Sequence, residues 1–290
     1  MLHKKHLYCF GLLFFLVIGQ ARASPPEKVV SLGGSVTEII YALGLEEALV
    51  GTDLSSVYPA AATNLPSVGY HRDLPIEGLI DLAPDVILAS EQAGPKQVLD
   101  RLATLGIRIE IIDDKPTLDS LSKRIGQIAT VFGADQQGKS LQEEVRQHTA
   151  VSEQSGQPVT ALVLMIHSNQ TQAAGANTAP ALLLQLAGLQ NVLEQQNGYR
   201  SISSESIAAL APDVIILTGS ATPEKTDDVG DEHSDPDTAD YAGLKLTPAA
   251  RNDTITTIDP LLMLSIGPRV GESLALLTEL RNRALDRADS

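Results

Sequence analysis

The chain has 290 residues, enough for two globular lobes, and its 43% hydrophobic content excludes a wholly disordered protein. Its formal net charge of −15 argues against nucleic-acid binding, because phosphates need a basic footprint. The single cysteine, Cys9, lies in the N-terminal apolar segment. The remainder of the chain therefore has no disulfide and no cysteine metal site.

The first 23 residues have the pattern of a secretory signal peptide. Lys4 and Lys5 precede an apolar run at 7–18, and the small-x-small segment 21–23 follows it. The run is shorter than the roughly 20 residues that a membrane-spanning helix needs. We expect cleavage after Ala23 and a mature protein in the periplasm.

Strands and helices alternate in the first half, which we assign to an N-terminal lobe at 24–133. Ser35 and Glu38 form a capping-box pattern at the start of the first helix. The turn at 33–34 is not a dinucleotide fingerprint, because G-x-G-x-x-G is absent. We expect strands at 29–32, 48–50, 86–88 and 107–112, and helices at 35–43 and 118–132, the second ended by Gly133. This alternation predicts a mostly parallel α/β sheet with helices on its faces.

A second lobe at 158–290 follows a polar but helix-favouring segment. Residues 134–157 lack the glycine and proline density of a flexible linker, so we expect one linking helix there. The second lobe begins with a strand at 159–166 that ends at His167, followed by a polar loop at 168–178 and a helix at 181–187. Acidic residues crowd 220–241, which predicts a mobile, solvated loop.

One short pattern occurs in each half of the chain. Gly69-Tyr70 is followed by Glu77 and by Ala-Pro-Asp at 83–85, and Gly198-Tyr199 is followed by Glu205 and by Ala-Pro-Asp at 211–213. The copies are too far apart for a solenoid, whose period is roughly 20–50 residues. They predict two similar lobes that face a cleft, where a small ligand binds.

The segment GYHRDLPIEGLIDLAPDVIL at 69–88 resembles the substrate-binding proteins of bacterial ABC importers for haem, cobalamin and siderophores. Residues 173–179 (AAGANTA) and 186–192 (LAGLQNV) are similar to the haem-binding branch. The resemblance covers the chain from Val29 to the C-terminal helix. It implies two α/β lobes joined by one long helix, a binding protein that is not an enzyme, and haem as the transported ligand. Its implied partners are inner-membrane ABC permease subunits and, upstream, an outer-membrane haem receptor system.

Tyr70 is the first candidate ligand for the haem iron. A phenolate is a known protein ligand of haem, but tyrosine ionises near pH 10 and needs the iron or an adjacent cation to ionise at neutral pH. In an extended segment, Arg72 would project to the same side as Tyr70 and could reach the phenolate or a propionate. The resemblance implies the same pair. The alternatives are a buried tyrosine with a backbone partner and a surface arginine, and Arg200 and Arg269 are further candidates for positive charge near the ligand.

Three more residues are candidates for contact with haem. His167 ends a strand at the edge where open α/β sheets present ligand-binding residues, so it is a second candidate iron ligand, for the same haem or for one stacked on it. The alternative is a structural histidine. His71 adjoins Tyr70 but would point the other way in an extended segment, and Tyr199 would line the opposite wall.

Glu77 and Glu205 each open a helix, where a carboxylate is favoured by the helix dipole, so capping is one interpretation. The resemblance implies instead that they dock on arginines of the two permease subunits. A cobalamin or ferric-siderophore binding protein is the nearest alternative function, although neither ligand needs a tyrosinate. An exported hydrolase or metalloenzyme is a third, but no G-x-S-x-G or H-E-x-x-H pattern supports it.

Overall fold

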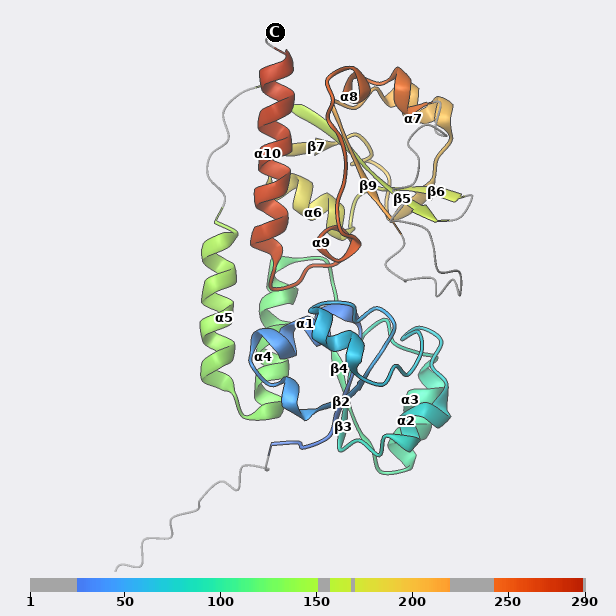
Figure 1. Ribbon diagram of the computed structural model, residues 1–290, viewed down its shortest axis with the longest axis vertical. Coiled ribbons are helices and arrows are strands. Elements are labelled where there is room, and N and C mark those ends of the chain that lie inside the picture. The colour runs from blue at the N-terminus through green and yellow to red at the C-terminus, as the bar shows by residue number, and fades with distance from the viewer. Residues whose placement is uncertain (1–24, 151–156, 168–169, 220–242, 289–290) are drawn as a thin grey trace, which may run out of the picture.

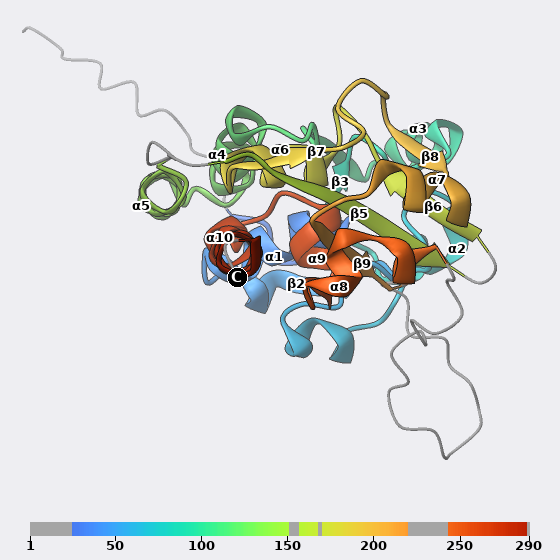
Figure 2. The ribbon, with the colours of Figure 1, turned by 90° about the horizontal axis from the view of Figure 1, so that it is seen from above.

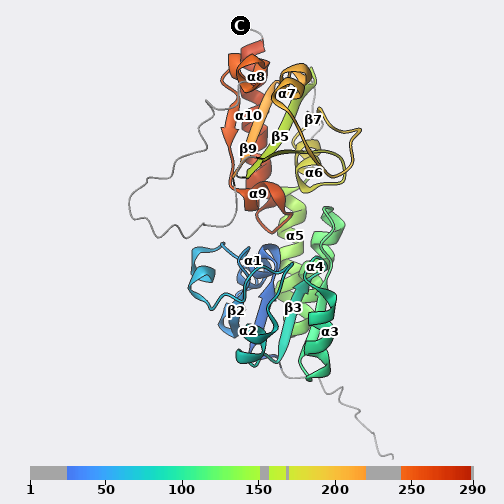
Figure 3. The same ribbon diagram turned by 90° about the vertical axis from the view of Figure 1, so that its right-hand side faces the viewer.

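Two α/β lobes make up the part of the chain that the computed structural model describes, which is residues 25–150, 157–167, 170–219 and 243–288 (Figure 1). Figure 3 shows the first lobe below the second. The predicted signal peptide at 1–23 and the predicted acidic loop at 220–241 lie outside the described residues. Within the described ranges, no helix is long and apolar enough to cross a bilayer.

A four-stranded parallel sheet forms the centre of the first lobe, in the order β2-β1-β3-β4. Its strands are β1 (Val29–Leu32), β2 (Leu49–Thr52), β3 (Val86–Ser90) and β4 (Arg108–Ile112). The central strands β1 and β3 are buried along their whole length, as expected for parallel strands covered on both faces. All four predicted strands are confirmed.

Both helices predicted in the first lobe from their periodicity, at 35–43 and 118–132, are confirmed as α1 (Gly34–Ala42) and α4 (Leu118–Phe132). The lobe also contains α2 (Ile76–Asp81) and α3 (Lys96–Thr104), with 3-10 turns at Glu46–Ala48 and Ala60–Asn64. In α4, Leu121, Ile125 and Ile128 are buried on one face. Gly133, with a φ of 69°, ends this helix in the left-handed conformation, because glycine adopts it without a Cβ clash.

The predicted capping box at Ser35 and Glu38 is wrong. Gly33 occupies the N-cap position of α1, without a side-chain cap. Ser35 instead accepts a hydrogen bond from the Arg124 guanidinium, and Glu38 Oε1 accepts one from Arg269 Nε at 3.3 Å. Burial raises the pKa of Glu38, although Arg269 acts in the opposite direction. Both side chains are buried and bond to residues distant in sequence, so neither of them caps the start of α1.

The segment between the lobes forms α5 (Asp135–His148), which begins one residue after the start predicted for the linking helix. Its buried residues include Leu141 and Val145, which the sequence placed on one side of the helix. The helix packs on α4 of the first lobe and also contacts α10 (Val270–Ala288) of the second. Figure 1 shows α5 alongside the first lobe.

The second lobe contains a mixed sheet in the order β10-β9-β5-β6-β8, with β7 paired to β5. Its strands are β5 (Val159–His167), β6 (Gln170–Ala174), β7 (Leu189–Asn191), β8 (Tyr199–Ser201), β9 (Val214–Thr218) and β10 (Ile255–Thr257). Strand β6 pairs antiparallel with both β5 and β8, whereas the other described pairs of this sheet are parallel. The predicted loop at 168–178 therefore contains strand β6. This strand was not predicted, because its polar residues form no apolar run.

A continuous hydrophobic core connects the two lobes along the side where α10 lies. The second-lobe helices are α6 (Ala179–Leu186), α7 (Ser204–Leu210), α8 (Pro248–Arg251), α9 (Pro260–Leu264) and α10, with a 3-10 turn at Leu244–Leu246. The same core cluster includes Ile39 and Ile128 of the first lobe and Leu183 and Leu277 of the second. The lobes thus pack on each other instead of meeting only through a linker.

Candidate ligand-binding cleft

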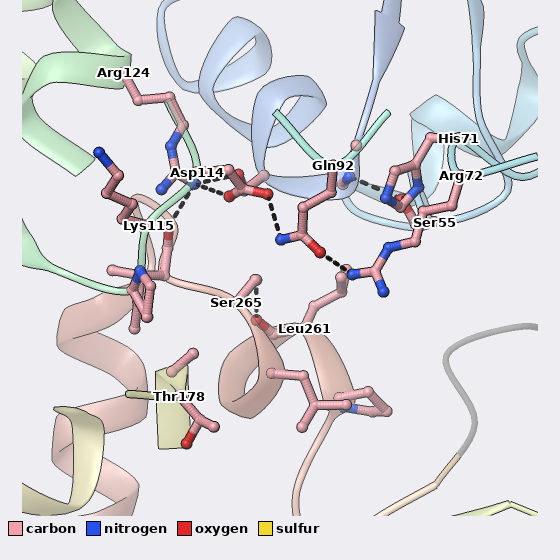
Figure 4. Close-up of a pocket in the computed structure, with 18 of the residues that line it drawn as sticks. Ser55, His71, Arg72, Gln92, Asp114, Lys115, Arg124, Thr178, Leu261 and Ser265 are labelled. Carbon is pink, nitrogen blue, oxygen red and sulfur yellow. Dashed lines mark hydrogen bonds and ion pairs between the residues drawn. The ribbon is translucent and has the colours of Figure 1, made fainter. Parts of the chain in front are cut away.

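A cleft of ≈ 300 Å³ lies between the lobes and is lined by residues of both (Figure 4). The first lobe contributes the loops that follow β1, β3 and β4, which are the carboxyl ends of parallel strands. The second lobe contributes the start of α6, the start of β8, and α9 with the residues after it. The predicted cleft between two lobes is therefore present, with a volume in the range of small-molecule sites.

A chain of polar contacts runs along the first-lobe wall of this cleft (Figure 4). The Arg124 guanidinium lies 3.1 Å from Asp114 Oδ1, and the Gln92 amide donates to Asp114 Oδ2 at 3.0 Å. The Arg72 guanidinium in turn donates to the Gln92 carbonyl oxygen. Ser90 donates its hydroxyl to Asp114 Oδ2 at 2.6 Å. These contacts hold Arg72 at the mouth of the cleft, where its side chain is still exposed.

The cleft carries a local excess of positive charge in an acidic protein. Arg72, Lys115 and Arg124 line it, and Asp114 is the one carboxylate among its described lining residues. Three cations facing one carboxylate suit a ligand with anionic groups. Sequence reasoning missed Lys115 and Arg124, although Lys115 follows the predicted strand at 107–112 and thus stands at the carboxyl end of a parallel strand.

The two arginines that the sequence offered as further positive charge do not line the cleft. Arg200 lies in a separate hollow of the second lobe, beside Ser203. Arg269 pairs with Glu38 and stacks over the Tyr58 ring at 3.5 Å from its centroid. Each of the two is used elsewhere in the fold.

Tyr70 lies beside the cleft but is not among its lining residues. Its carbonyl oxygen accepts a hydrogen bond from the Asp73 amide at 2.9 Å, so residues 70–73 form a turn. The expectation of an extended segment, which would place Arg72 on the same side as Tyr70, is therefore wrong. The residue is 41% exposed, which rules out the alternative of a buried structural tyrosine. Its role as iron ligand stays a prediction.

His71 is buried in the cleft wall and does not point away from Tyr70. The turn at 70–73 brings the two rings together, with centroids 4.9 Å apart and an edge-on arrangement. His71 Nδ1 lies 2.8 Å from Asp53 Oδ2. Burial would raise the pKa of Asp53, but hydrogen bonds led by the one from His71, with others from Ser55 and Gly33, hold it below its ordinary value. Sequence reasoning missed Asp53, although this residue directly follows β2 and so stands at the carboxyl end of a parallel strand.

Tyr199 lies on the second-lobe side of the same cleft, as predicted for the counterpart of Tyr70. Although 38% of the residue is exposed, burial raises the pKa of the Tyr199 phenol to about 12, and the Arg72 charge opposes this shift. The raised pKa makes the Tyr199 phenolate harder to form, which suits a wall residue better than an iron ligand.

His167 ends β5, where its backbone pairs with Gln170. Its side chain is outside the part of the structure that is described, so its place as a second iron ligand stays a prediction.

The segment AAGANTA at 173–179 forms an arch that brings two residues to the cleft. A Cβ on Gly175 would lie 2.0 Å from the Gln196 carbonyl oxygen, so only glycine fits there. Asn177 has a φ of 58°, and Thr178 caps α6 by accepting a hydrogen bond from the Ala181 amide at 3.3 Å. Asn177 and Thr178 both line the cleft. The backbone conformation of this segment thus places Asn177 and Thr178 at the cleft.

Glu77 and Glu205 are exposed in the first turns of α2 and α7. The N-cap of α2 is Pro75, without a side-chain hydrogen bond, whereas Ser203 caps α7. A hydrogen bond from the Ser203 hydroxyl lowers the pKa of Glu205. Figures 1 and 2 both show α2 and α7 on the same side of the molecule, one in each lobe. The two carboxylates are placed where one partner could contact both lobes.

Comparisons with known proteins agree with this architecture. The pattern of the family described as periplasmic binding protein matches residues 29–261. The vitamin B12-binding protein of Yersinia pestis (strain Pestoides F) is 28% identical over 200 residues, 68% of this chain and 71% of its own length. A periplasmic haem-binding protein from Pseudomonas aeruginosa is 31% identical with a TM-score of 0.76, covering 87% of this chain and 91% of that one. The apo form of the haem-binding protein RhuT from Roseiflexus sp. RS-1 is 32% identical with a TM-score of 0.76, covering 92% and 100%.

Proposed function

Because the chain belongs to the periplasmic binding protein family, we propose that it captures haem between its lobes and delivers it to an ABC importer of the inner membrane. Members of this family bind and carry a substrate, and the chain is not an enzyme. The observation that carries the proposal is the similarity to two haem-binding proteins over at least 87% of the chain. The signal peptide predicted at 1–23 would bring the protein to the periplasm.

The chemistry of the cleft supports an anionic, iron-containing ligand. Haem carries two propionate carboxylates, and Arg72, Lys115 and Arg124 are the cations that line the cleft. Tyr70 would supply a phenolate to ferric iron, and His167 would supply an imidazole from the second lobe. Tyr199 would contribute to the wall.

Cobalamin is the second candidate ligand, because a vitamin B12-binding protein is among the relatives of this chain. The periphery of cobalamin is made mostly of neutral amides, so it offers the three cleft cations a single phosphodiester. Its cobalt also needs no tyrosinate from the protein. The charge of the cleft therefore favours haem over cobalamin.

Titration of the purified mature protein with hemin and, separately, with cobalamin tests the function. We expect the hemin titration to develop a Soret band and the charge-transfer band of a ferric tyrosinate complex. In equilibrium dialysis, we expect the protein to retain no cobalamin. An unchanged hemin spectrum together with retained cobalamin would overturn the haem assignment and establish the alternative.

We also propose that Glu77 and Glu205 dock the protein on cationic residues of the two permease subunits. One exposed carboxylate per lobe, on the same side of the molecule, matches a partner built from two subunits. The double variant Glu77→Lys/Glu205→Lys should lose haem uptake in proteoliposomes that hold the transporter, because like charges would then face each other.

The same double variant should bind hemin as the unmodified protein does, since neither glutamate lines the cleft. Glu144→Lys, an exposed substitution on α5 away from α2 and α7, is the matched control and should transport normally. Normal uptake by the double variant would refute the docking role.

A further inference from the structure

A wholly buried carboxylate stands behind the first-lobe wall of the cleft. The Asp53 side chain has no exposed surface. Its Oδ1 accepts hydrogen bonds from the Gly33 amide and the Ser56 hydroxyl, both at 2.8 Å. Its Oδ2 accepts from the Ser55 amide at 3.0 Å and from the Ser55 hydroxyl at 2.6 Å, and it lies 2.8 Å from His71 Nδ1. Five contacts fix the carboxylate in place and offset the cost of burying it.

The contact with Asp53 decides which nitrogen of His71 carries a hydrogen. The amides of Gly33 and Ser55 can only donate, so the carboxylate that they face acts as an acceptor, and His71 Nδ1 is the donor. The lone pair of the neutral imidazole is then on Nε2. Among the described residues, Nε2 makes no hydrogen bond. It is also absent from the buried side-chain atoms that lack a partner, so it is not buried. The remaining accessible surface of the ring, 10% of the side chain, therefore includes this nitrogen.

This arrangement differs from that of a histidine that only stabilises a core. A core histidine satisfies both nitrogens inside the protein, whereas His71 leaves one open in a residue that lines the cleft (Figure 4). A carboxylate on one ring nitrogen and a free second nitrogen is what metal-ligating histidines have, because the carboxylate fixes the tautomer and the orientation of the ring. Imidazole is also a recognised ligand of haem iron.

We propose that His71, oriented by Asp53, is an imidazole ligand for the haem iron, which it binds when Tyr70 is not bound. The proposal rests on the haem-binding function proposed above. The two rings are in edge-on contact, so a small shift of the ligand takes the iron from one residue to the other. In that exchange one iron–oxygen bond breaks, one iron–nitrogen bond to Nε2 forms, and the phenolate takes a proton from water. An external one-electron reductant such as dithionite, which converts the iron to the ferrous state, favours the exchange, because ferrous iron prefers imidazole to a hard phenolate.

Resonance Raman spectroscopy of the reduced haem complex tests the proposal in a Tyr70→Phe/His167→Gln background, which lacks the two other iron ligands proposed above. We expect this variant to retain haem and to show the iron–histidine stretching band. Addition of His71→Gln, whose amide can still donate to Asp53, should remove the band and weaken hemin binding about 10–100-fold, the range seen when groups around a metal site are lost. Asp53→Asn in the same background should weaken binding and shift the band, because the carboxylate no longer polarises the imidazole.

His148→Gln in the same background is the matched control, because His148 is exposed on α5 and does not line the cleft, and it should leave the band in place. The proposal is overturned if the Tyr70→Phe/His167→Gln background shows no iron–histidine band, if the band survives His71→Gln, or if it disappears with His148→Gln instead. Failure of the unmodified protein to bind hemin is a different result and overturns the proposed function itself. Circular dichroism of each variant confirms that it is folded, and His71→Gln decides the test if Asp53→Asn does not fold.

Discussion

The Tyr70→Phe variant is expected to lose the charge-transfer band of ferric tyrosinate and to bind hemin about 100-fold more weakly than the unmodified protein. Loss of a group that only supports a metal ligand already costs about 10–100-fold in affinity, so loss of the anionic ligand itself should reach the upper end of that range. The residual binding comes from burial of the porphyrin, from the cations that line the cleft and from the His71 imidazole. Hemin titration followed by absorption spectroscopy measures both changes.

Tyr199→Phe is the matched control for this prediction, because it removes the phenol of the internal counterpart. Burial raises the pKa of Tyr199 to about 12, which disfavours the phenolate that an iron ligand would need, so its removal should leave the tyrosinate band in place. Retention of the band in Tyr70→Phe, with loss of it in Tyr199→Phe, would exchange the roles of the two tyrosines.

Replacing Arg124 with methionine is expected to lower the free energy of unfolding by about 3 kcal/mol, within the range for removing one partner of a buried ion pair. Arg124 is 1% exposed. Its guanidinium contacts Ser35 of α1, Asp114 after β4 and, at 3.1 Å, the Ile266 carbonyl oxygen of the second lobe. Methionine retains the aliphatic part of the side chain but removes the guanidinium that contacts these three groups. Its loss also loosens the packing between the lobes.

Urea unfolding of the ligand-free protein, with the m-value held equal, measures this loss. Arg146→Met is the matched control, because Arg146 pairs with Glu143 three residues earlier on the exposed face of α5 and should leave the midpoint unchanged. The double variant Arg124→Met/Asp114→Asn should recover part of the stability, since it removes the unpaired carboxylate. A midpoint for Arg124→Met equal to that of Arg146→Met would contradict the structural role.

Local patterns in the sequence were sufficient for the strands of the first lobe, for several helices and for the two-lobed architecture. The apolar stripe of α4 and Gly133 after it identify a helix and its end, because hydrophobic periodicity and the left-handed preference of glycine act within a few residues. Strand β6 was missed because its first three residues are polar, so it lacks an apolar run, although it pairs with β5 and β8 inside the sheet. The repeat of Gly-Tyr and Glu likewise placed Tyr199 on the cleft and one exposed glutamate in each lobe.

Tertiary structure alone decided which side chains meet. Ser35 and Glu38 have the spacing of a capping box, yet their partners Arg124 and Arg269 are 89 and 231 residues away in sequence. Such contacts depend on how the lobes pack, which no local pattern encodes. The turn at 70–73 likewise decided which side chains meet in the site, because it directed His71 toward Asp53 and into the cleft wall. The sequence by itself thus determined the family, the lobes and the candidate ligands, whereas folding selected the cations of the cleft and the histidine that Asp53 orients.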